Sequence, residues 1–156
     1  NGFYASKGLI NRNLQKCFLK NQYFKKDYPK SLDKNFFNAF FNDYKISNLN
    51  KFDLIATLNE ITFNTILLGI KKLPEFPRTL FVSGGGLRNK FLMKKLKKNI
   101  NSKFVDLNKF KIKPDFVESQ LISLLSARSY YNLPITFPNT TGVKTASTGG
   151  EIFVPL

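Results

Sequence analysis

The sequence predicts an α/β protein with a mostly parallel sheet and helices packed against it. A strand-like run at 79–83 is followed by three glycines and by a basic segment with helical spacing at 89–99. A second strand-like run follows at 103–107, and a helix between two nearby strands is typical of a parallel, right-handed crossover. Long helical patterns at 53–72 and 115–131 supply further helices for the sheet.

The first third of the chain is expected to be helical only in parts. Apolar residues recur at a helical spacing up to residue 20, after an interruption at Gly8. Residues 21–52 are rich in Asn, Lys and aromatic residues and lack a clean period, so we expect irregular structure with short helical turns at 34–41. Four aromatic side chains in this region are expected to fill the core rather than to stack on nucleic-acid bases, namely Phe36, Phe37, Phe40 and Phe41.

The long helix at 53–72 carries signals at both ends. Asp53 is a suitable N-cap, and Lys71 lies where the helix dipole favours a positive charge. Polar residues such as Thr57 and Glu60 are expected in packing contacts and on the exposed surface. The apolar stripe expected to face the core comprises Leu54, Leu58, Ile61, Thr65 and Leu68.

The helix at 115–131 begins with a capping-box pattern. Pro114 precedes it, Asp115 is the natural N-cap, and Glu118 lies three residues further on. The tail after this helix is polar and turn-forming, and residues 151–155 are expected to add a last short strand.

Length and composition fit one domain with its own core, because 42% of the 156 residues are hydrophobic. No apolar run approaches the roughly 20 residues of a membrane span, and the start lacks the layout of a signal peptide, so we expect a cytoplasmic protein with no membrane partner. The single Cys17 is expected to be a buried thiol. The absence of His, together with the single Cys, excludes the ordinary zinc sites, a Ser-His-Asp triad and a Cys-His pair.

The net charge of +15 raises the alternative of a nucleic-acid-binding module. Lys supplies most of this charge, whereas base-edge recognition depends heavily on Arg. Lys, Asn, Phe and Ile are enriched together, as an AT-rich genome would produce whatever the function. We therefore expect nucleic acid not to be the partner. The lysines expected on a solvated helix face are Lys90, Lys94, Lys95, Lys97 and Lys98.

Three consecutive glycines between a strand and a helix indicate a ligand that approaches the main chain. Without Cβ atoms, Gly84, Gly85 and Gly86 leave room for a phosphate, a ribose or a flat base. Arg88 can reach a phosphate or stack on a base, and Asn89 can contact a ligand, cap the next helix, or do both. These five residues form the candidate nucleotide site.

Three classes of nucleotide site place glycines at such a point. A Rossmann-type site would use Asp106 to hold a ribose, but Asn89 replaces the third glycine of its fingerprint. A P-loop is excluded because no Gly-Lys-Ser/Thr follows at the required spacing. The third class is the adenosine-contacting turn of the superfamily that joins sugar kinases, heat-shock ATPases and actin. A Rossmann or methyltransferase-type domain stays open as the alternative.

Five stretches carry a family resemblance: NGFYASKG at 1–8, PKSLDKNFFN at 29–38, DLIATLNEITFNTI at 53–66, VSGGGLRNKFLMKKL at 82–96 and PDFVESQLISLLSAR at 114–128. In this order they resemble the C-terminal part of the anhydro-N-acetylmuramic acid kinases, bacterial enzymes of cell-wall sugar recycling. The chain departs from the family where it reads Leu32-Asp33-Lys34-Asn35, since the family usually has Thr-Gly-Arg-Glu there.

The resemblance implies a ribonuclease-H-like (actin-like ATPase) half-domain, with residues 1–156 as a single C-terminal domain or a fragment of a two-domain kinase. It implies ATP and Mg²⁺ as cofactors, with the phosphate-binding, metal-binding and catalytic-base residues upstream of Asn1. No catalytic residue is therefore assigned within the chain, and no activity is expected of it in isolation. The glycine site would take the nucleoside, and Glu118 would hold hydroxyl or amide groups of the sugar.

The reaction that the resemblance implies joins phosphorylation to ring opening. ATP phosphorylates 1,6-anhydro-N-acetylmuramic acid at O6 while water opens the anhydro ring, which gives N-acetylmuramic acid 6-phosphate. The family is also described as dimeric, and an exposed sheet edge would recruit a partner, so we expect a homodimer.

Overall fold

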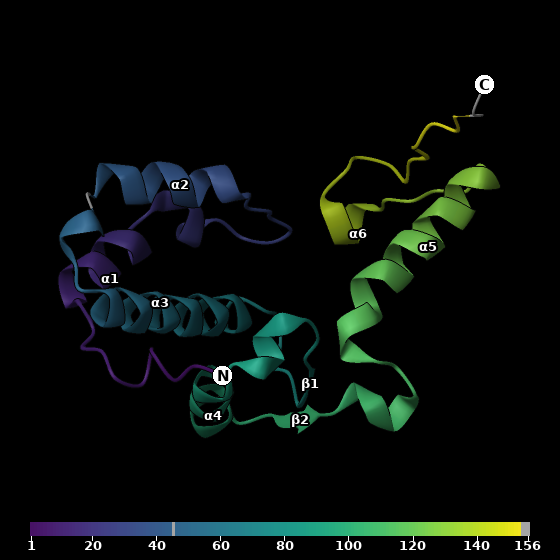
Figure 1. The fold of residues 1–156 in the computed structure, drawn as a ribbon. Helices are drawn as coiled ribbons and strands as arrows, with labels where there is room; N and C mark the ends of the chain where they lie inside the picture. The colour runs from purple at the N-terminus through teal and green to yellow at the C-terminus, as the bar shows by residue number, and fades with distance from the viewer. Residues whose placement is uncertain (45, 154–156) are drawn as a thin grey trace.

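The helices of the first half begin at side chains that cap them. In the computed structural model, which describes residues 1–44 and 46–153, the side chains of Asn11, Asp33 and Asn50 each accept a hydrogen bond from a main-chain N–H of the following first turn. The helices that follow these caps are α1 (Arg12–Leu19), α2 (Lys34–Asp43) and α3 (Lys51–Lys71). They pack together on one side of the molecule (Figure 1).

The cap of α3 corrects the sequence prediction, because Asn50 and not Asp53 occupies the N-cap. The helix therefore starts two residues earlier than the predicted 53–72 and ends at Lys71. The carboxylate of Asp53 instead accepts a hydrogen bond of 2.6 Å from the main-chain N–H of Leu9. Asp53 thus holds the N-terminal segment against the start of α3.

The predicted parallel unit is confirmed. It consists of β1 (Thr79–Phe81), α4 (Lys90–Asn99) and β2 (Lys103–Val105), and the strands pair in parallel with Leu80 opposite Phe104. Both strands are shorter than the predicted runs at 79–83 and 103–107. The helices and this small parallel sheet confirm the α/β class.

Two hydrophobic clusters flank α3. One joins α1 and α2 to α3 around Phe18, which is fully buried. The aromatic rings whose centroids lie 4.9–6.0 Å from that of Phe18 belong to Phe24, Phe36, Phe37, Phe40 and Phe41. The other cluster joins Phe63 of α3 to α4 and to the inner face of the sheet. The prediction that the four phenylalanines of α2 fill a core is only partly right: Phe36, Phe40 and Phe41 pack against this cluster, but Phe37 is 38% exposed.

Packing on two sides explains why the predicted single stripe on α3 is only partly right. Ile61 is buried as expected, but Leu68 is exposed. The buried residues of α3 are Ala56, Thr57, Asn59, Glu60, Ile61 and Phe63, which form a broad face rather than a narrow stripe. Of the packing contacts and exposed surface expected for the polar residues of this helix, Thr57 and Glu60 therefore take the packing contacts, and neither lies on the exposed surface.

The prediction of a buried Cys17 is also wrong, because its thiol is exposed. Leu14 and Phe18, four positions apart on α1, turn together toward α3 and are fully buried. Cys17 lies outside this face and points toward solvent.

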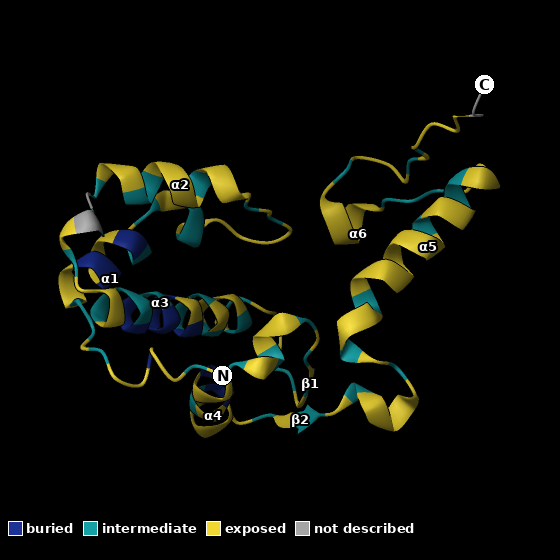
Figure 2. Ribbon diagram, viewed as in Figure 1, coloured by how far each residue is buried: buried dark blue, intermediate teal, exposed yellow. Residues whose placement is uncertain are grey.

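The C-terminal helix α5 (Val117–Tyr130) differs most from expectation. The prediction that a helix at 115–131 packs on the sheet is wrong: α5 extends away from the sheet, and most of its surface is exposed (Figures 1 and 2). One face of the sheet is covered by α3 and α4, while on the other Phe81 lies against Phe110. Apolar side chains of α5 that remain exposed are Leu121, Ile122 and Leu124.

The capping box predicted for α5 does not form. Residues Pro114–Phe116 make a 3₁₀ turn, Phe116 occupies the N-cap position, and no side chain caps the helix. The carboxylate of Asp115 is drawn instead into an ion pair with Arg88. Glu118 lies in the first turn of α5 and is exposed.

The tail forms the short helix α6 (Pro138–Thr141) and an isolated antiparallel bridge between Thr136 and Ser147. Residues 151–153 of the predicted last strand are irregular, and the rest of that strand lies outside the described residues. Within residues 1–44 and 46–153, no helix combines the length and the apolar character that crossing a membrane requires.

An ion pair ties the loop before α2 to the C-terminal end of α3. Lys72 Nζ lies 2.8 Å from Asp27 Oδ1 and also donates a hydrogen bond to the main-chain oxygen of Lys25. The hydrogen bond and the charge of Lys72 lower the pKa of Asp27. Desolvation, followed by the charge of Lys72, lowers the pKa of the nearby Lys30.

Candidate functional site

The glycine turn follows directly from the end of β1. Gly84 has a φ of 80° and a ψ of −179°, a conformation that residues with a Cβ rarely adopt. Its main-chain N–H donates a 3.1 Å hydrogen bond to the oxygen of Pro114, which fixes the turn to the segment before α5. Residues Gly85–Arg88 then form the 3₁₀ turn η3, and α4 begins at Lys90.

The main chain of this turn is open. A Cβ built on Gly84, Gly85 or Gly86 would meet no described heavy atom within 4 Å. Gly2 and Gly8 are different, since a Cβ would lie 2.2 Å from Asn89 Oδ1 at the first and 2.0 Å from a main-chain oxygen at the second. Packing among the described residues therefore requires glycine at Gly2 and Gly8 but not at Gly85 or Gly86.

A pocket of about 320 Å³ lies beside the turn, between the ends of β1 and β2 and the start of α4. Val82, Leu87 and Phe104 form part of its wall, and the three glycines do not line it. Asp106 also lines it, but one of its carboxylate oxygens accepts hydrogen bonds from both the main chain and the side chain of Asn108. This local role weakens the alternative in which Asp106 holds a ribose.

Arg88 joins the glycine turn to the start of α5. Its guanidinium lies 2.8 Å from the carboxylate of Asp115, and both side chains are more than half exposed. Such a surface pair contributes at most about 1 kcal/mol to stability. The guanidinium remains within reach of solvent, so a ligand anion could compete with Asp115 for it.

The interpretation of Asn89 as an N-cap is confirmed. Its Oδ1 accepts a hydrogen bond of 3.1 Å from the main-chain N–H of Leu92 in α4, and its Nδ2 donates one of 2.9 Å to Asn59 Oδ1 on α3. The side chain thus links α4 to α3.

Glu118 lies on the first turn of α5, four positions after Pro114. It lines neither the pocket beside the turn nor the larger pocket against Asn89. The structure therefore brings Arg88 and Asp115 together at the glycine turn, and it leaves Glu118 on a separate exposed surface.

Sequence reasoning missed a polar cluster between α3 and α4. Glu60 is 7% exposed, and its carboxylate pairs with Lys95 of α4 and lies 3.8 Å from Arg12 of α1. Lys95 is thereby removed from the predicted solvated face, while Lys90, Lys94, Lys97 and Lys98 are exposed as expected. The signal that could have found Glu60 is its spacing, because it lies four positions after Ala56 and three before Phe63 on the buried face of the helix.

The chain matches the sequence model of the anhydro-N-acetylmuramic acid kinases over residues 1–155. It belongs to the anhydro-N-acetylmuramic acid kinase family. The curated anhydro-N-acetylmuramic acid kinase of Zymomonas mobilis is 32% identical over 151 residues, which are 97% of this chain and 40% of that protein.

Two further anhydro-N-acetylmuramic acid kinases show the same extent of similarity. The Brucella anthropi protein is 35% identical over 97% of this chain and 40% of its own length. The Hydrogenovibrio crunogenus protein is 30% identical over 99% of this chain and 43% of its own length. The chain thus spans about two fifths of the length of the curated relatives that it matches.

Proposed function

We propose that the chain provides the nucleoside-binding part of an ATP-dependent kinase that phosphorylates 1,6-anhydro-N-acetylmuramic acid at O6 with hydrolytic opening of the anhydro ring. The single observation that carries this proposal is the open main chain at Gly84, Gly85 and Gly86, in a chain of this kinase family. The turn follows the carboxyl end of a parallel strand, where α/β sheets bind their ligands. ATP as phosphoryl donor is consistent with the cytoplasm as the site of the reaction.

In the proposed reaction, water attacks C1 of the sugar and the bond between C1 and O6 breaks. O6 forms a bond to the γ-phosphorus of ATP, the bond from that phosphorus to the ADP oxygen breaks, and the proton of the water passes to a base outside this chain. Phosphoryl transfer depends mainly on positioning and on charge stabilisation. The part we assign to this chain is to hold and orient the nucleoside at the glycine turn.

The described residues fit a nucleoside better than a metal ion. Bare main chain at Gly85 and Gly86 leaves space for a flat base or a ribose, and Arg88 stands beside them. Among residues 1–44 and 46–153, no three carboxylate, His or Cys side chains gather as metal ligands. We therefore derive no step through Mg²⁺ from these residues.

The architecture that we propose for the chain is part of a ribonuclease-H-like domain, in the C-terminal portion of the longer kinase. The parallel β1–α4–β2 unit and the order of the family stretches support it. Glu118 keeps its proposed role toward the sugar, since its carboxylate is free of a capping role in α5. A homodimer formed over the exposed apolar side chains of α5 is part of the same proposal.

The kinase proposal is tested with a hybrid enzyme. Replacing the matched 151 residues of the Zymomonas mobilis kinase by this chain is expected to give an enzyme that forms the sugar 6-phosphate from ATP and the anhydro-sugar, measured by mass spectrometry. The isolated chain is expected to form none, because the positioning of the γ-phosphate needs residues beyond it. A folded hybrid without product, or turnover by the isolated chain, would contradict the proposed division of roles.

A further inference from the structure

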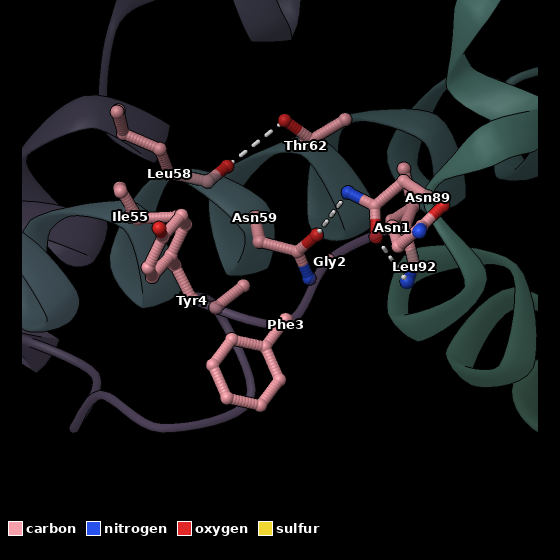
Figure 3. Close-up of a pocket in the computed structure, with 11 residues that line it drawn as sticks. Asn1, Gly2, Phe3, Tyr4, Ile55, Leu58, Asn59, Thr62, Asn89 and Leu92 are labelled. Atoms are coloured by element: carbon pink, nitrogen blue, oxygen red, sulfur yellow. Dashed lines mark hydrogen bonds between the residues drawn. The ribbon is translucent and has the colours of Figure 1, made fainter.

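A second candidate site lies between the loop before α2 and the C-terminal part of α3. It is a pocket of about 340 Å³, lined from the loop by residues between 23 and 32, and we call it the loop pocket. This volume is in the range of small-molecule sites, which measure roughly 300–1,000 Å³. The loop pocket shares no lining residue with the pocket beside the glycine turn or with the larger pocket against Asn89 (Figure 3). It is therefore a separate site.

Most of the wall of the loop pocket is apolar. The loop contributes Phe24 and Leu32, α2 contributes Phe37, and α3 contributes Ile66 and Leu68. The side chains from the two helices are large and apolar, yet each of them is more than one third exposed. A ligand with an apolar body would remove this surface from water, which favours binding.

Gly69 leaves the α3 side of the loop pocket bare. It lines the pocket, and a Cβ there would meet no described heavy atom within 4 Å. Its backbone belongs to α3 and lacks the positive φ that favours glycine. A glycine within a helix lowers stability relative to alanine, and neither packing among the described residues nor backbone geometry accounts for this one. Room for a bound molecule does account for it.

Two ammonium groups give the loop pocket its charge. Lys30 Nζ donates hydrogen bonds of 3.1 and 2.8 Å to the main-chain oxygens of Tyr23 and Lys26. Lys72 Nζ donates one of 2.9 Å to the main-chain oxygen of Lys25. The two ammonium groups therefore lie near each other, since their acceptors belong to neighbouring residues. Desolvation, followed by the charge of Lys72, lowers the pKa of Lys30, and a nearby anion would oppose both causes.

Both ammonium groups keep a donor for a ligand. Each carries three N–H groups, of which Lys30 uses two on main-chain oxygens and Lys72 uses one on the main chain and one on Asp27, as far as the described residues show. Lys30 is half-buried, and the side chain of Lys72 is 27% exposed, so solvent reaches both. Asp27 does not line the loop pocket, and no other carboxylate among the described residues does.

This lining selects the chemistry of the ligand. A carboxylate offers acceptors only, so it can receive a hydrogen bond from each ammonium group and place a negative charge beside two positive ones. A cation would be repelled by both lysines. A small anion without an apolar body would leave the wall exposed to water, and a neutral apolar molecule would leave both ammonium groups without an anion. A single carboxylate on an apolar body satisfies the whole lining.

We propose that the loop pocket binds a small monocarboxylate with an apolar body, whose carboxylate lies between Lys30 and Lys72 while its body covers Gly69 and the apolar wall. Aliphatic and aromatic carboxylic acids share this chemistry. The binding does not depend on the glycine turn, on Glu118 or on kinase activity.

The proposal is tested by NMR titration of the labelled chain with hexanoate, phenylacetate, hexan-1-ol and acetate. At least one of the two larger acids is expected to shift the main-chain amide signals of Ile66 and Gly69 saturably, and the tighter one shows whether the body is aliphatic or aromatic. Hexan-1-ol lacks the charge and acetate lacks the apolar body, so each should bind about tenfold more weakly or less. No saturable shift with either larger acid, or binding of hexan-1-ol or acetate as tight as theirs, would overturn the proposal.

Two variants separate the shape of the loop pocket from its charge. Gly69→Leu fills the pocket from α3, and Lys30→Met removes one ammonium group at nearly the same side-chain length. Each is expected to weaken binding of the tighter acid by about tenfold or more. Gly69→Leu tests the site without altering the loop, because a Cβ at this position meets no described atom within 4 Å and leucine favours a helix more than glycine does.

The matched control for the charge is Lys98→Met. Lys98 is exposed on α4, so this variant loses the same charge as Lys30→Met and should bind the acid as the original chain does. Unchanged binding by a folded Gly69→Leu protein would overturn the location of the site. An equal loss of binding in Lys98→Met and Lys30→Met would mean that only the net charge of the chain attracts the acid, which would also overturn the proposal.

Discussion

Phe18→Ala is expected to lower the free energy of unfolding by about 3–5 kcal/mol. Phe18 is fully buried, and five other phenylalanine rings surround it within the cluster that joins α1, α2 and α3. Removing the ring leaves a cavity that neighbours on three helices cannot all fill, so the loss exceeds the transfer energy of the ring itself. Urea denaturation followed by circular dichroism measures the change.

The matched control for this prediction is Phe153→Ala, because Phe153 is 83% exposed. Removing such an exposed ring should change the free energy of unfolding by less than about 0.5 kcal/mol. A domain of this size has only about 5–15 kcal/mol of stability, so Phe18→Ala would remove a large part of it. Equal effects of the two substitutions would mean that the aromatic cluster around Phe18 is not the core of the helical layer.

Glu60→Ala is expected to destabilise the chain by roughly 2–4 kcal/mol. The side chain of Glu60 is 10% exposed and its carboxylate pairs with Lys95, whose ammonium also lies 4.6 Å from the centre of the Phe63 ring. Removing the carboxylate leaves Lys95 against apolar surface without its partner. The lysine is 28% exposed and can turn partly toward water, which keeps the expected loss below that of a fully enclosed charge.

The control for Glu60 is the exposed pair of Arg88 and Asp115, which lie 2.8 Å apart. Arg88→Ala should cost no more than about 1 kcal/mol, because water already solvates both groups. Added salt should weaken the exposed pair and leave the Glu60 pair nearly unchanged. If Glu60→Ala proves no more harmful than Arg88→Ala, the carboxylate is solvated rather than buried between α3 and α4.

Sequence patterns correctly predicted those helices, strands and turns that are determined by residues close together in the chain. The strand, glycine turn, helix and strand between residues 79 and 107 follow one another closely, so alternation, Gly breaks and an Asn cap were enough to place them. The cap of α3 was misplaced because Asn50 and Asp53 are both good caps. The choice between them depends on Leu9, whose N–H binds Asp53 from 44 residues away.

The failures on α5 and at Glu60 have the same physical origin. Asp115 and Glu118 fit a capping box, but the pairing of Asp115 with Arg88 across 27 residues removes the cap. Glu60 is buried because Lys95, 35 residues further on, meets it on another helix. Such pairings depend on which elements meet, and helical periodicity does not contain that information.

The candidate functional features also differ in whether the sequence could predict them. The open glycine turn was predictable, because three glycines in a row remove side chains whatever surrounds them. The loop pocket was not predictable, since Lys30 and Lys72 come together only where the loop before α2 meets the end of α3.

The nucleoside role of the glycine turn is tested most directly by the KM for ATP of a Gly85→Val variant, made in the hybrid kinase. A Cβ at Gly85 would meet no described atom within 4 Å, so we expect folding to be preserved while the methyl groups of valine occupy the place proposed for the nucleoside. Gly69→Val is the matched control, because a Cβ there also meets nothing within 4 Å. We predict a rise in KM of about tenfold or more for Gly85→Val and little change for Gly69→Val. An unaltered KM for ATP in a folded Gly85→Val enzyme would contradict the account.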